Sequence, residues 1–368
     1  MPTIAELLAK LDTRFPFSHA ESWDKTGLLV GDQSARVTRV LIAYEVTNDA
    51  LDAAQSRGCE AVVAYHPLIF RPLDKLDFSD RTARLCARLI REERHLICVH
   101  TALDGAAPPH ALGDALARQL GIVGAQVGKP SGGEELTQII YFVPRDKLDV
   151  TREAAWQAGA GTIGLYDEAS FVSFGRGTFR PLPGASPSDG AIGARSEADE
   201  VRVELLARRR QTSAILEAIR RAHPYEEVAH CLVPLSNAPV EPYGPLRLAP
   251  LEDGDETTLA FWIARAKERL NVPHVRVAAP RETRFAHVAC SPGSGASFIA
   301  SLPRGTVFIS GDFKHHDALG AQDLGVALID VTHAATETAT IELMAGALEG
   351  VAGLEIVRDA MRNPFDFA

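Results

Sequence analysis

Two kinds of hydrophobic pattern alternate along the first third of the chain. Short apolar runs predict strands over residues 39–46, 60–67 and 95–104, and the amphipathic stretches 48–58 and 79–94 between them predict helices. Apolar strands that alternate with helices are typical of βαβ units, whose mostly parallel sheet is covered by helices. This part of the chain therefore predicts an α/β fold.

The last quarter repeats this order of elements. Apolar runs predict strands over 305–312 and 326–333, and a further strand over 284–295 that ends in a glycine-rich turn. The intervening and following segments have helical patterns, at 296–302, at 315–325 and through ATIELMAGALEGV. Both ends of the chain thus follow one plan, which predicts an α/β domain assembled from the two ends.

The middle of the chain has a different order. Residues 136–161 and 200–227 each predict a strand followed by a helix, and the turn-rich segment 175–190 separates them. Two such halves are typical of a ferredoxin-like α+β unit.

The linkers predict where this middle unit begins and ends. Segments 128–135 and 235–245 are rich in glycine, proline and polar residues, as domain boundaries commonly are. We therefore predict that residues 1–133 and 241–368 form the α/β domain and that residues 134–240 are inserted into it.

The composition narrows the classes of function. A chain of 368 residues is long enough for two domains. Its net charge of −10 argues against nucleic acid as a partner, because surfaces that bind nucleic acid are basic. No apolar run reaches about 18 residues, so no membrane span is predicted. The 5 cysteines form no CxxC pair, which argues against a disulfide framework and favours the cytoplasm.

Histidines and carboxylates follow several of the predicted strands. His66 ends one apolar strand, Asp104 ends another, and His333 ends a third, with Glu337 four positions later. A fourth apolar strand leads into three more such residues, Asp312, His315 and His316. Because ligands of open α/β sheets bind beyond the carboxyl ends of the strands, we expect these side chains to share one edge.

The types of side chain point to a metal. Imidazole and carboxylate groups without thiolates suit Zn, Mn, Fe, Co or Ni. His333 and Glu337 are spaced i and i+4, so both can reach one ion from one helix face, and a carboxylate can also bridge two ions. The spacing alone leaves two alternatives open, a pair of metal ligands or an incidental pair at a helix start.

Short segments distributed over the chain resemble the NIF-three-like family, whose members are identified as di-metal homologues of GTP cyclohydrolase I type 2. The segments are ESWDKTGLLVGD, YHPLIFRPL, HTALD, GDFKHHDA and DVTHAATE. The middle of the chain, with GTFRPLPGASP and AHPYEE, resembles the PII/CutA-like domain inserted in the longer members. The resemblance covers nearly the whole chain and implies a NIF-three-like α/β domain with a ferredoxin-like, PII/CutA-like insert.

Carried over residue by residue, the resemblance implies metal ligands at His66, Asp104, His333 and Glu337 and two divalent ions per chain. The family has a second histidine just before His66, but this chain has Tyr65 there. Three alternatives follow. Tyr65 ligates as a phenolate, water takes the place of the missing imidazole, or the second ion binds weakly.

Two further histidines are candidates for the same site. His316 is a candidate contact to the substrate or to a ligand, or a histidine that only caps a helix. His100 lies four residues before Asp104 and is a candidate to orient that carboxylate, because carboxylates that bind metals are themselves hydrogen-bonded. A plain histidine at a strand end is the alternative for His100.

The resemblance also implies a toroidal homohexamer and a small-molecule substrate, with hydrolytic opening of the GTP imidazole ring as the activity. One hypothesis is therefore a metal-dependent hydrolase of a purine nucleotide. The other is a non-catalytic regulator or adaptor that binds metal and uses the insert as a sensor or assembly element. Tyr65 modestly favours this second hypothesis, because it removes an imidazole from the site.

Overall fold

The computed structural model describes residues 1–188, 190–252, 254–281 and 284–365. The chain divides into two compact units, which are Met1–Gly132 with Pro242–Ala368 and Gly133–Glu241. We call them the larger unit and the insert. The insert predicted from the sequence, 134–240, differs from the observed one by one residue at each end. No helix in the described part of the chain is long and apolar enough to cross a membrane.

A five-stranded sheet forms one half of the larger unit. Four of its strands are parallel, and β1 pairs antiparallel with β4. In spatial order the strands are β1 (Gly27–Val30), β4 (His95–Cys98), β3 (Ala61–Ala64), β2 (Arg39–Ala43) and β17 (Glu355–Arg358). The helices α2 (Asn48–Ser56) and α3 (Arg81–Arg91) connect β2 to β3 and β3 to β4, as expected of βαβ units.

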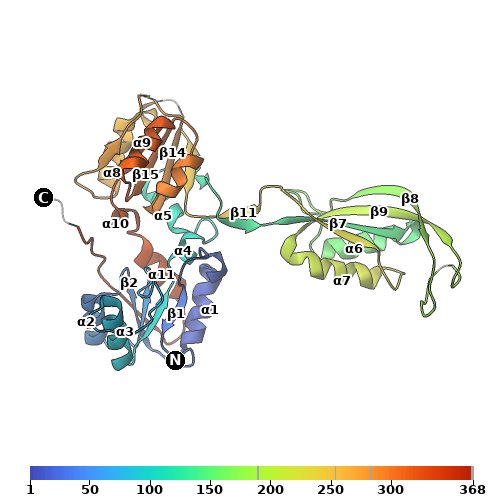
Figure 1. The fold of residues 1–368 in the computed structure, drawn as a ribbon, viewed down its shortest axis with the longest axis horizontal. Coiled ribbons are helices and arrows are strands. Elements are labelled where there is room, and N and C mark those ends of the chain that lie inside the picture. The colour runs from blue at the N-terminus through green and yellow to red at the C-terminus, as the bar shows by residue number, and fades with distance from the viewer. Residues whose placement is uncertain (189, 253, 282–283, 366–368) are drawn as a thin grey trace. The chain divides into compact units, whose positions relative to one another are not determined.

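Both faces of this sheet are buried, which explains the unbroken apolar runs in the sequence. In β3, Val62 belongs to the core cluster that α2 and α3 cover. The next residue, Val63, points to the opposite face, where it packs with α1 (Ile4–Arg14) and α11 (Thr340–Leu348). Figure 1 shows the two layers of helices on either side of the sheet.

A six-stranded sheet forms the other half of the larger unit. In spatial order its strands are β13 (Arg276–Ala278), β16 (Val326–Asp330), β15 (Thr306–Gly311), β14 (His287–Ser294), β12 (Arg247–Pro250) and β5 (Gln126–Val127). The three longest strands, β14 to β16, are parallel, and the outer strands are antiparallel to their neighbours. Helices α5 (Leu112–Leu120) and α8 (Leu259–Arg269) pack on one face, and α9 (His315–Asp323) packs on the other with the 3₁₀ helix η5 (Ala296–Ser301).

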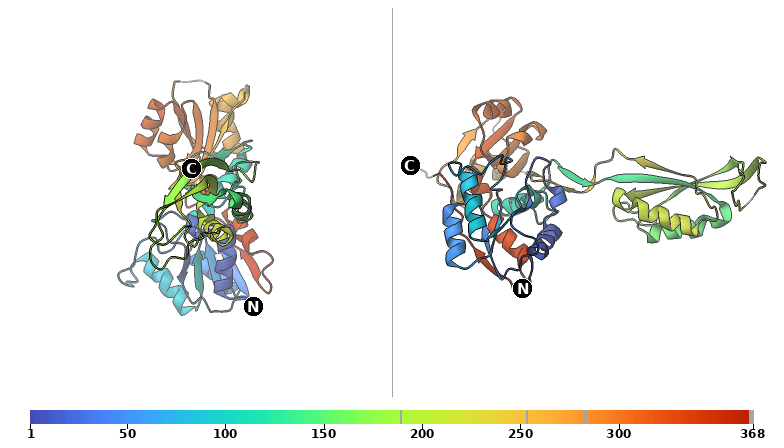
Figure 2. Two further views of the ribbon diagram at one scale, coloured as in Figure 1. Left: turned by 90° about the vertical axis from the view of Figure 1, so that its right-hand side faces the viewer. Right: turned by 60° about the horizontal axis from the view of Figure 1, so that its bottom comes forward.

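The insert is a β-α-β-β-α-β unit with an antiparallel sheet in the order β10-β7-β9-β8. Its strands are β7 (Leu136–Pro144), β8 (Phe171–Phe179), β9 (Ser196–Arg208) and β10 (His230–Pro234). Both helices, α6 (Leu148–Gln157) and α7 (Thr212–Ala222), lie on one face of this sheet (Figure 2). Two short strands, β6 (Gly132–Glu134) and β11 (Val240–Tyr243), pair where the chain enters and leaves the insert.

The strand predicted over 95–104 is wrong in its second half, where the short helix α4 (Thr101–Asp104) follows β4. His100 leaves the extended conformation, with φ of 34° and ψ of −121°, and so turns the chain. Asp24 stabilises the new helix start, because its carboxylate accepts hydrogen bonds from both the backbone N–H and the hydroxyl of Thr101. The predicted ligand at the end of this range therefore lies on a helical turn.

Other predicted elements differ from the structure at their ends. The strand predicted over 326–333 ends at Asp330, and the short helix α10 (His333–Thr336) follows it. A separate helix, α11, then replaces the single long helix predicted there. Residues 296–302 predict an α-helix but form the 3₁₀ helix η5, and β14 extends into the predicted glycine-rich turn.

Three residues that follow strands have left-handed backbone conformations. The φ angle is 34° at His100, 59° at Asp312 and 74° at Thr332. Thr332 is the least suited to it, because its side chain is β-branched and its ψ of 153° belongs to a region that is essentially reserved for glycine. Its hydroxyl oxygen is also buried without a hydrogen-bond partner among the described residues.

Replacing Thr332 with glycine is expected to stabilise the protein. Thr332→Gly removes the strained side chain and the unpaired hydroxyl, and should raise the free energy of unfolding by about 1 kcal/mol after the larger entropy of glycine is subtracted. Urea denaturation measures the change. Thr13→Gly is the matched control, because Thr13 is exposed in α1 and glycine weakens a helix. A Thr332→Gly protein that is less stable than the parent would contradict the conclusion that the backbone at Thr332 is strained.

Candidate metal centre

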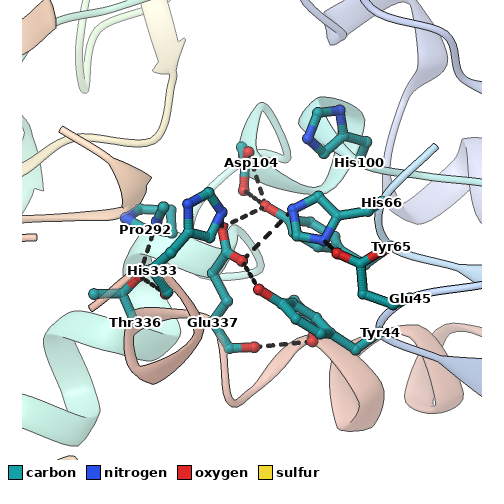
Figure 3. A network of polar contacts seen from close by, with 12 residues as sticks. Tyr44, Glu45, Tyr65, His66, His100, Asp104, Pro292, His333, Thr336 and Glu337 are labelled. Atoms are coloured by element: carbon teal, nitrogen blue, oxygen red, sulfur yellow. Dashed lines mark hydrogen bonds and ion pairs between the residues drawn. The ribbon is translucent and has the colours of Figure 1, made fainter. Parts of the chain in front are cut away.

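Strand ends from both sheets of the larger unit meet in one polar cluster (Figure 3). Tyr44 and Glu45 follow β2, Tyr65 and His66 follow β3, and His333 begins α10 just after β16. Each of these residues is the polar continuation of an apolar strand. The shared edge that the sequence predicts is therefore formed by the carboxyl ends of strands from two separate sheets.

Three side chains of this cluster are placed to share an ion. Among the described residues, one ligand atom each from His66, His333 and Glu337 lies within 4.8 Å of the others. Nε2 of His333 is 3.2 Å from Oε1 of Glu337, and Nε2 of His66 is 3.8 Å from Oε2 of the same carboxylate. Two imidazoles and a carboxylate suit the divalent ions of Zn, Mn, Fe, Co and Ni. The residues therefore fit a divalent ion.

A carboxylate lies behind each imidazole. Nδ1 of His333 is hydrogen-bonded to Oδ2 of Asp312 at 2.8 Å. Nδ1 of His66 lies 3.1 Å from Oε1 of Glu45, at the distance of an ion pair but without the angles of a hydrogen bond. Carboxylates in this position hold a proton on Nδ1 and leave Nε2 free to bind a metal.

The acidic neighbours change the protonation of the cluster. Burial lowers the pKa of His333, but the hydrogen bonds and charges of Glu337 and Asp312 outweigh burial and raise this pKa to about 9. Burial raises the pKa of Glu45, but the neighbouring His66 outweighs it, so the carboxyl pKa lies below its usual value. His333 is therefore protonated at neutral pH in the metal-free protein, and an ion has to displace that proton.

Glu337 is a carboxylate with a side chain that is almost completely buried, since the residue is 2% exposed. The hydroxyl of Tyr44 donates a hydrogen bond to its Oε2 at 2.6 Å, and the hydroxyl of Tyr65 lies 3.4 Å from its Oε1. Burial and the charge of Glu337 raise the pKa of Tyr44, so this phenol keeps its proton and donates it. The sequence gives no indication of this role for Tyr44, although its position directly after an apolar strand is the same signal that identifies His66.

Asp104 contacts Tyr65 in this cluster. The hydroxyl oxygen of Tyr65 lies 3.0 Å and 3.1 Å from the two carboxylate oxygens of Asp104. Burial of the carboxyl group, followed by the negative charge of Glu337, raises the pKa of Asp104 to about 7. The group of three potential ligands does not include Asp104, so its assignment as a metal ligand stays a prediction.

The two additional histidines lie in different surroundings. Nδ1 of His100 is 2.7 Å from Oδ1 of Asp24, and its ring centroid is 5.2 Å from that of His66. The described hydrogen bonds therefore connect His100 to the loop before β1 and not to Asp104, which it was predicted to orient. His316 is exposed at the start of α9, with its ring 5.3 Å from that of His315.

A cleft of about 1250 Å³ opens onto the cluster, a volume large enough for a nucleotide. Its described lining includes four residues that follow the strands, Tyr44, Glu45, His66 and His333, and four arginines, Arg57, Arg81, Arg276 and Arg362. His316 is not among the described lining residues.

Gly293, in the turn after the apolar part of β14, approaches Glu337 closely. A Cβ atom at Gly293 would lie 2.7 Å from Oε1 of Glu337, so a side chain there would displace the carboxylate. The backbone N–H of Gly293 donates to the hydroxyl of Thr336 at 2.8 Å, one residue before the carboxylate. The glycine-rich turn thus provides room for Glu337 in this structure.

The comparisons with known proteins all point to one family. The model of Duf34/NIF3 (NGG1p interacting factor 3) matches residues 2–364. A "GTP cyclohydrolase 1 type 2 homolog" of Staphylococcus aureus is 31% identical over 332 residues, which are 90% of this chain and 88% of the relative. A protein of the same name from Halalkalibacterium halodurans is 34% identical over 320 residues, 86% of this chain and 85% of the relative.

A solved structure shares the fold over the full length. It is the crystal structure of a Bacillus cereus protein related to NIF3, with a TM-score of 0.74 and 28% sequence identity. The similarity covers 100% of this chain and 99% of the other.

Metal binding is expected to weaken when the partner of His333 is neutralised. Asp312→Asn removes the carboxylate that holds Nδ1 of His333, and outer partners of this kind change metal affinity by roughly 10- to 100-fold. Competition with a fluorescent chelator measures the dissociation constant. Asp323→Asn, an exposed position on α9, is the matched control and should leave it unchanged. Equal affinities of the Asp312→Asn and parent proteins would argue against this role of the carboxylate.

The stability of the metal-free protein is expected to fall with rising pH. Folding raises the pKa of Asp104 from 3.8 to about 7 and that of His333 from 6.5 to about 9, so the folded state binds more protons than the unfolded chain. The contribution of Asp104 is complete below its unfolded pKa and is lost as pH rises through about 7. That of His333 is complete below pH 6.5 and is lost through about 9.

Urea denaturation of chelator-treated protein at several pH values measures this dependence. His333→Gln should flatten the part of the profile above about pH 6.5, whereas His316→Gln at an exposed position should leave the slope as it is. A free energy of unfolding that stays constant or rises through pH 9 would contradict the assignment.

Proposed function

The chain belongs to the Duf34/NIF3 family, and on that premise we propose that it is a divalent-metal-dependent hydrolase of a purine nucleotide. One observation carries the proposal. Two imidazoles and a buried carboxylate, His66, His333 and Glu337, point at one position beside a cleft, and each imidazole has its own carboxylate behind it. Such a set of residues is typical of sites that hold a catalytic ion.

The residues of the chain have distinct tasks in this proposal. His66, His333 and Glu337 hold the ion, and Glu45 and Asp312 orient the two rings. An ion held by these groups would lower the pKa of bound water to about 7 and so supply an activated water near neutral pH. The geometry does not select among Zn, Mn, Fe, Co and Ni, which all accept nitrogen and oxygen ligands.

The choice of a purine nucleotide rests on the names of the relatives and on the cleft. Two relatives over 30% identical carry the name "GTP cyclohydrolase 1 type 2 homolog". The cleft is nucleotide-sized, and the four arginines of its described lining, Arg57, Arg81, Arg276 and Arg362, offer cationic groups for phosphates. Two of them are already paired with carboxylates, Arg276 with Asp330 and Arg362 with Asp49, so a phosphate has to compete for them.

The ligand set implied by the family resemblance is larger than these three residues. It adds Asp104 as a fourth ligand and a second ion shared through Glu337. In the described geometry the Asp104 carboxylate accepts a hydrogen bond from Tyr65, so an ion at Asp104 would share this carboxylate with the phenol or displace it.

A second function, a metal-binding regulator or adaptor, is favoured by the surface of the insert. Several large apolar residues in this part of the chain are exposed, among them Leu165, Tyr166, Phe171 and Phe174. Exposed apolar residues that gather into a patch mark interaction sites, and the β-α-β-β-α-β order of the insert supports its proposed likeness to PII/CutA-like domains. The proposal includes assembly into a homohexamer in the cytoplasm, with a mass six times that of one chain by light scattering.

Hydrolysis of GTP with a panel of divalent metals tests the first function. The protein is purified without chelator, its metal content is determined by elemental analysis, and GTP turnover is followed by chromatography with Zn, Mn, Fe, Co or Ni. His333→Ala removes a ligand and should lower the turnover rate by roughly 100-fold or more, at least as much as the loss of an outer partner.

His316→Ala is the matched control, because this histidine is exposed and outside the described cleft lining. It should retain the parent rate. If the parent and His333→Ala proteins show the same background rate with every metal, the hydrolase proposal is wrong. Bound metal in that parent protein would then support the regulator.

A further inference from the structure

The hydroxyl group of Tyr65 lies between two carboxylates of the site. It is 3.0 Å and 3.1 Å from the oxygens of Asp104 and 3.4 Å from Oε1 of Glu337. We infer that this chain binds one divalent ion, at His66, His333 and Glu337, and that the Tyr65 hydroxyl takes the place of a second ion. The inference rests on the metal-binding part of the proposed function and not on hydrolysis.

The first ion has a complete set of protein ligands without Asp104. Nε2 of His66, Nε2 of His333 and the carboxylate of Glu337 provide three donors, and catalytic ions commonly have three protein ligands with an open position for water. Nothing in this set requires a second ion nearby, because Tyr44 donates a hydrogen bond to one oxygen of Glu337 and the Tyr65 hydroxyl lies beside the other.

A second ion between Asp104 and Glu337 would compete with the phenol for space. Metal–oxygen distances in such sites are about 2.0–2.2 Å. An ion that bound both carboxylates would therefore lie against the Tyr65 hydroxyl, because this oxygen is within hydrogen-bonding distance of both. Tyr65 has to move away or give up its proton to admit the ion.

The packing around Tyr65 prevents its side chain from moving away. Tyr65 is 1% exposed. Its ring centroid lies 6.1 Å from that of Tyr44, 4.7 Å from that of His66 and 5.4 Å from that of His100, so aromatic rings surround it. Swinging the phenol out would break these contacts and leave the carboxylate of Asp104 without its donor.

Loss of the proton from the Tyr65 hydroxyl would place one more negative charge in a buried site. A phenolate at Tyr65 would lie within 3.4 Å of two carboxylates, whereas the neutral phenol adds no charge and donates its one proton to one of them. An imidazole at the same position would behave differently, because it offers a neutral nitrogen lone pair and is shorter than a phenol. It would leave space for an ion between itself and the two carboxylates.

Counting bound ions tests the inference directly. The parent, Tyr65→His, Tyr65→Phe and Tyr166→Phe proteins are loaded with excess Mn²⁺, desalted and measured by elemental analysis against protein concentration. We expect about one ion per chain in the parent and about two in Tyr65→His. Tyr166→Phe is the matched control, because this tyrosine is exposed on the insert and belongs to no part of the site, and it should retain the parent count.

Electron paramagnetic resonance of the same samples distinguishes isolated ions from coupled pairs. The parent should give the spectrum of an isolated Mn²⁺, and Tyr65→His the spectrum of an exchange-coupled pair. If Tyr65→His does not fold, Tyr65→Phe decides the matter, because a phenol that is not a ligand can be lost without a loss of ions.

Two ions in the parent would overturn the inference, as would a folded Tyr65→His protein that still binds one. A fall from two ions to one in Tyr65→Phe would identify the phenolate as a ligand and overturn it as well. A parent without metal would instead overturn the proposed metal-dependent function itself. If the parent protein binds two ions and hydrolyses GTP, the proposed function is supported and only the single-ion inference is wrong.

Discussion

The buried carboxylate of Glu337 sets the main constraint on this site. A carboxylate in the interior is stable only when hydrogen bonds, cations or a metal compensate for the water it has lost. The fold supplies such partners from both sheets of the larger unit. Tyr44 and His66 extend from the five-stranded sheet, and His333 extends from the six-stranded sheet. The carboxylate therefore links the two halves of the unit, and the candidate metal centre and the packing of these halves depend on the same group.

The sharp turns after the strands are the structural cost of this arrangement. An extended chain would carry each polar residue past the site, whereas left-handed residues at His100, Asp312 and Thr332 turn it back. The two turns of the six-stranded sheet share one anchor. Asp330 is buried, and its carboxylate accepts hydrogen bonds from the backbone N–H of Phe313 at 3.2 Å and of Thr332 at 3.0 Å. One buried carboxylate thus holds the conformations that aim His333 and its partner Asp312 at the site.

The sequence predicts the parts of the fold that are buried on both faces. The apolar runs that become β3, β15 and β16 are unbroken because helices cover both sides of each sheet, and that environment leaves a clear pattern. The pattern does not predict β1 or β17. The residues of β1 are only partly buried, and β17 pairs with β2 from the opposite end of the chain, so neither has a local signal.

The candidate site also has parts that the sequence predicts and parts that it does not. His66, His333 and Glu337 could be predicted, since histidines and carboxylates at strand ends are a recognisable combination, and the structure brings these three together. The contacts of Tyr44 and Tyr65 could not be predicted, because tyrosines are also common in hydrophobic cores. Only the three-dimensional structure shows which carboxylate accepts the hydrogen bond of each phenol. The chain turns at His100, so Asp104 does not lie on the predicted strand. This turn could not be predicted either, because it depends on hydrogen bonds to Asp24, which lies in a loop distant in sequence.

Protons maintain the centre in the absence of metal. His333 carries a positive charge beside Glu337, Tyr44 donates to the same carboxylate, and the raised pKa of Asp104 favours a neutral group next to Tyr65. A divalent ion at His333 and Glu337 would replace the His333 proton as the compensating charge without requiring the strands to move. The candidate ligands are therefore held by hydrogen bonds of the chain itself, unlike those of small domains that are unfolded until their ion binds. Metal binding here should release protons rather than drive folding, because the energy that positions the ligands is already present in the packing of the two sheets.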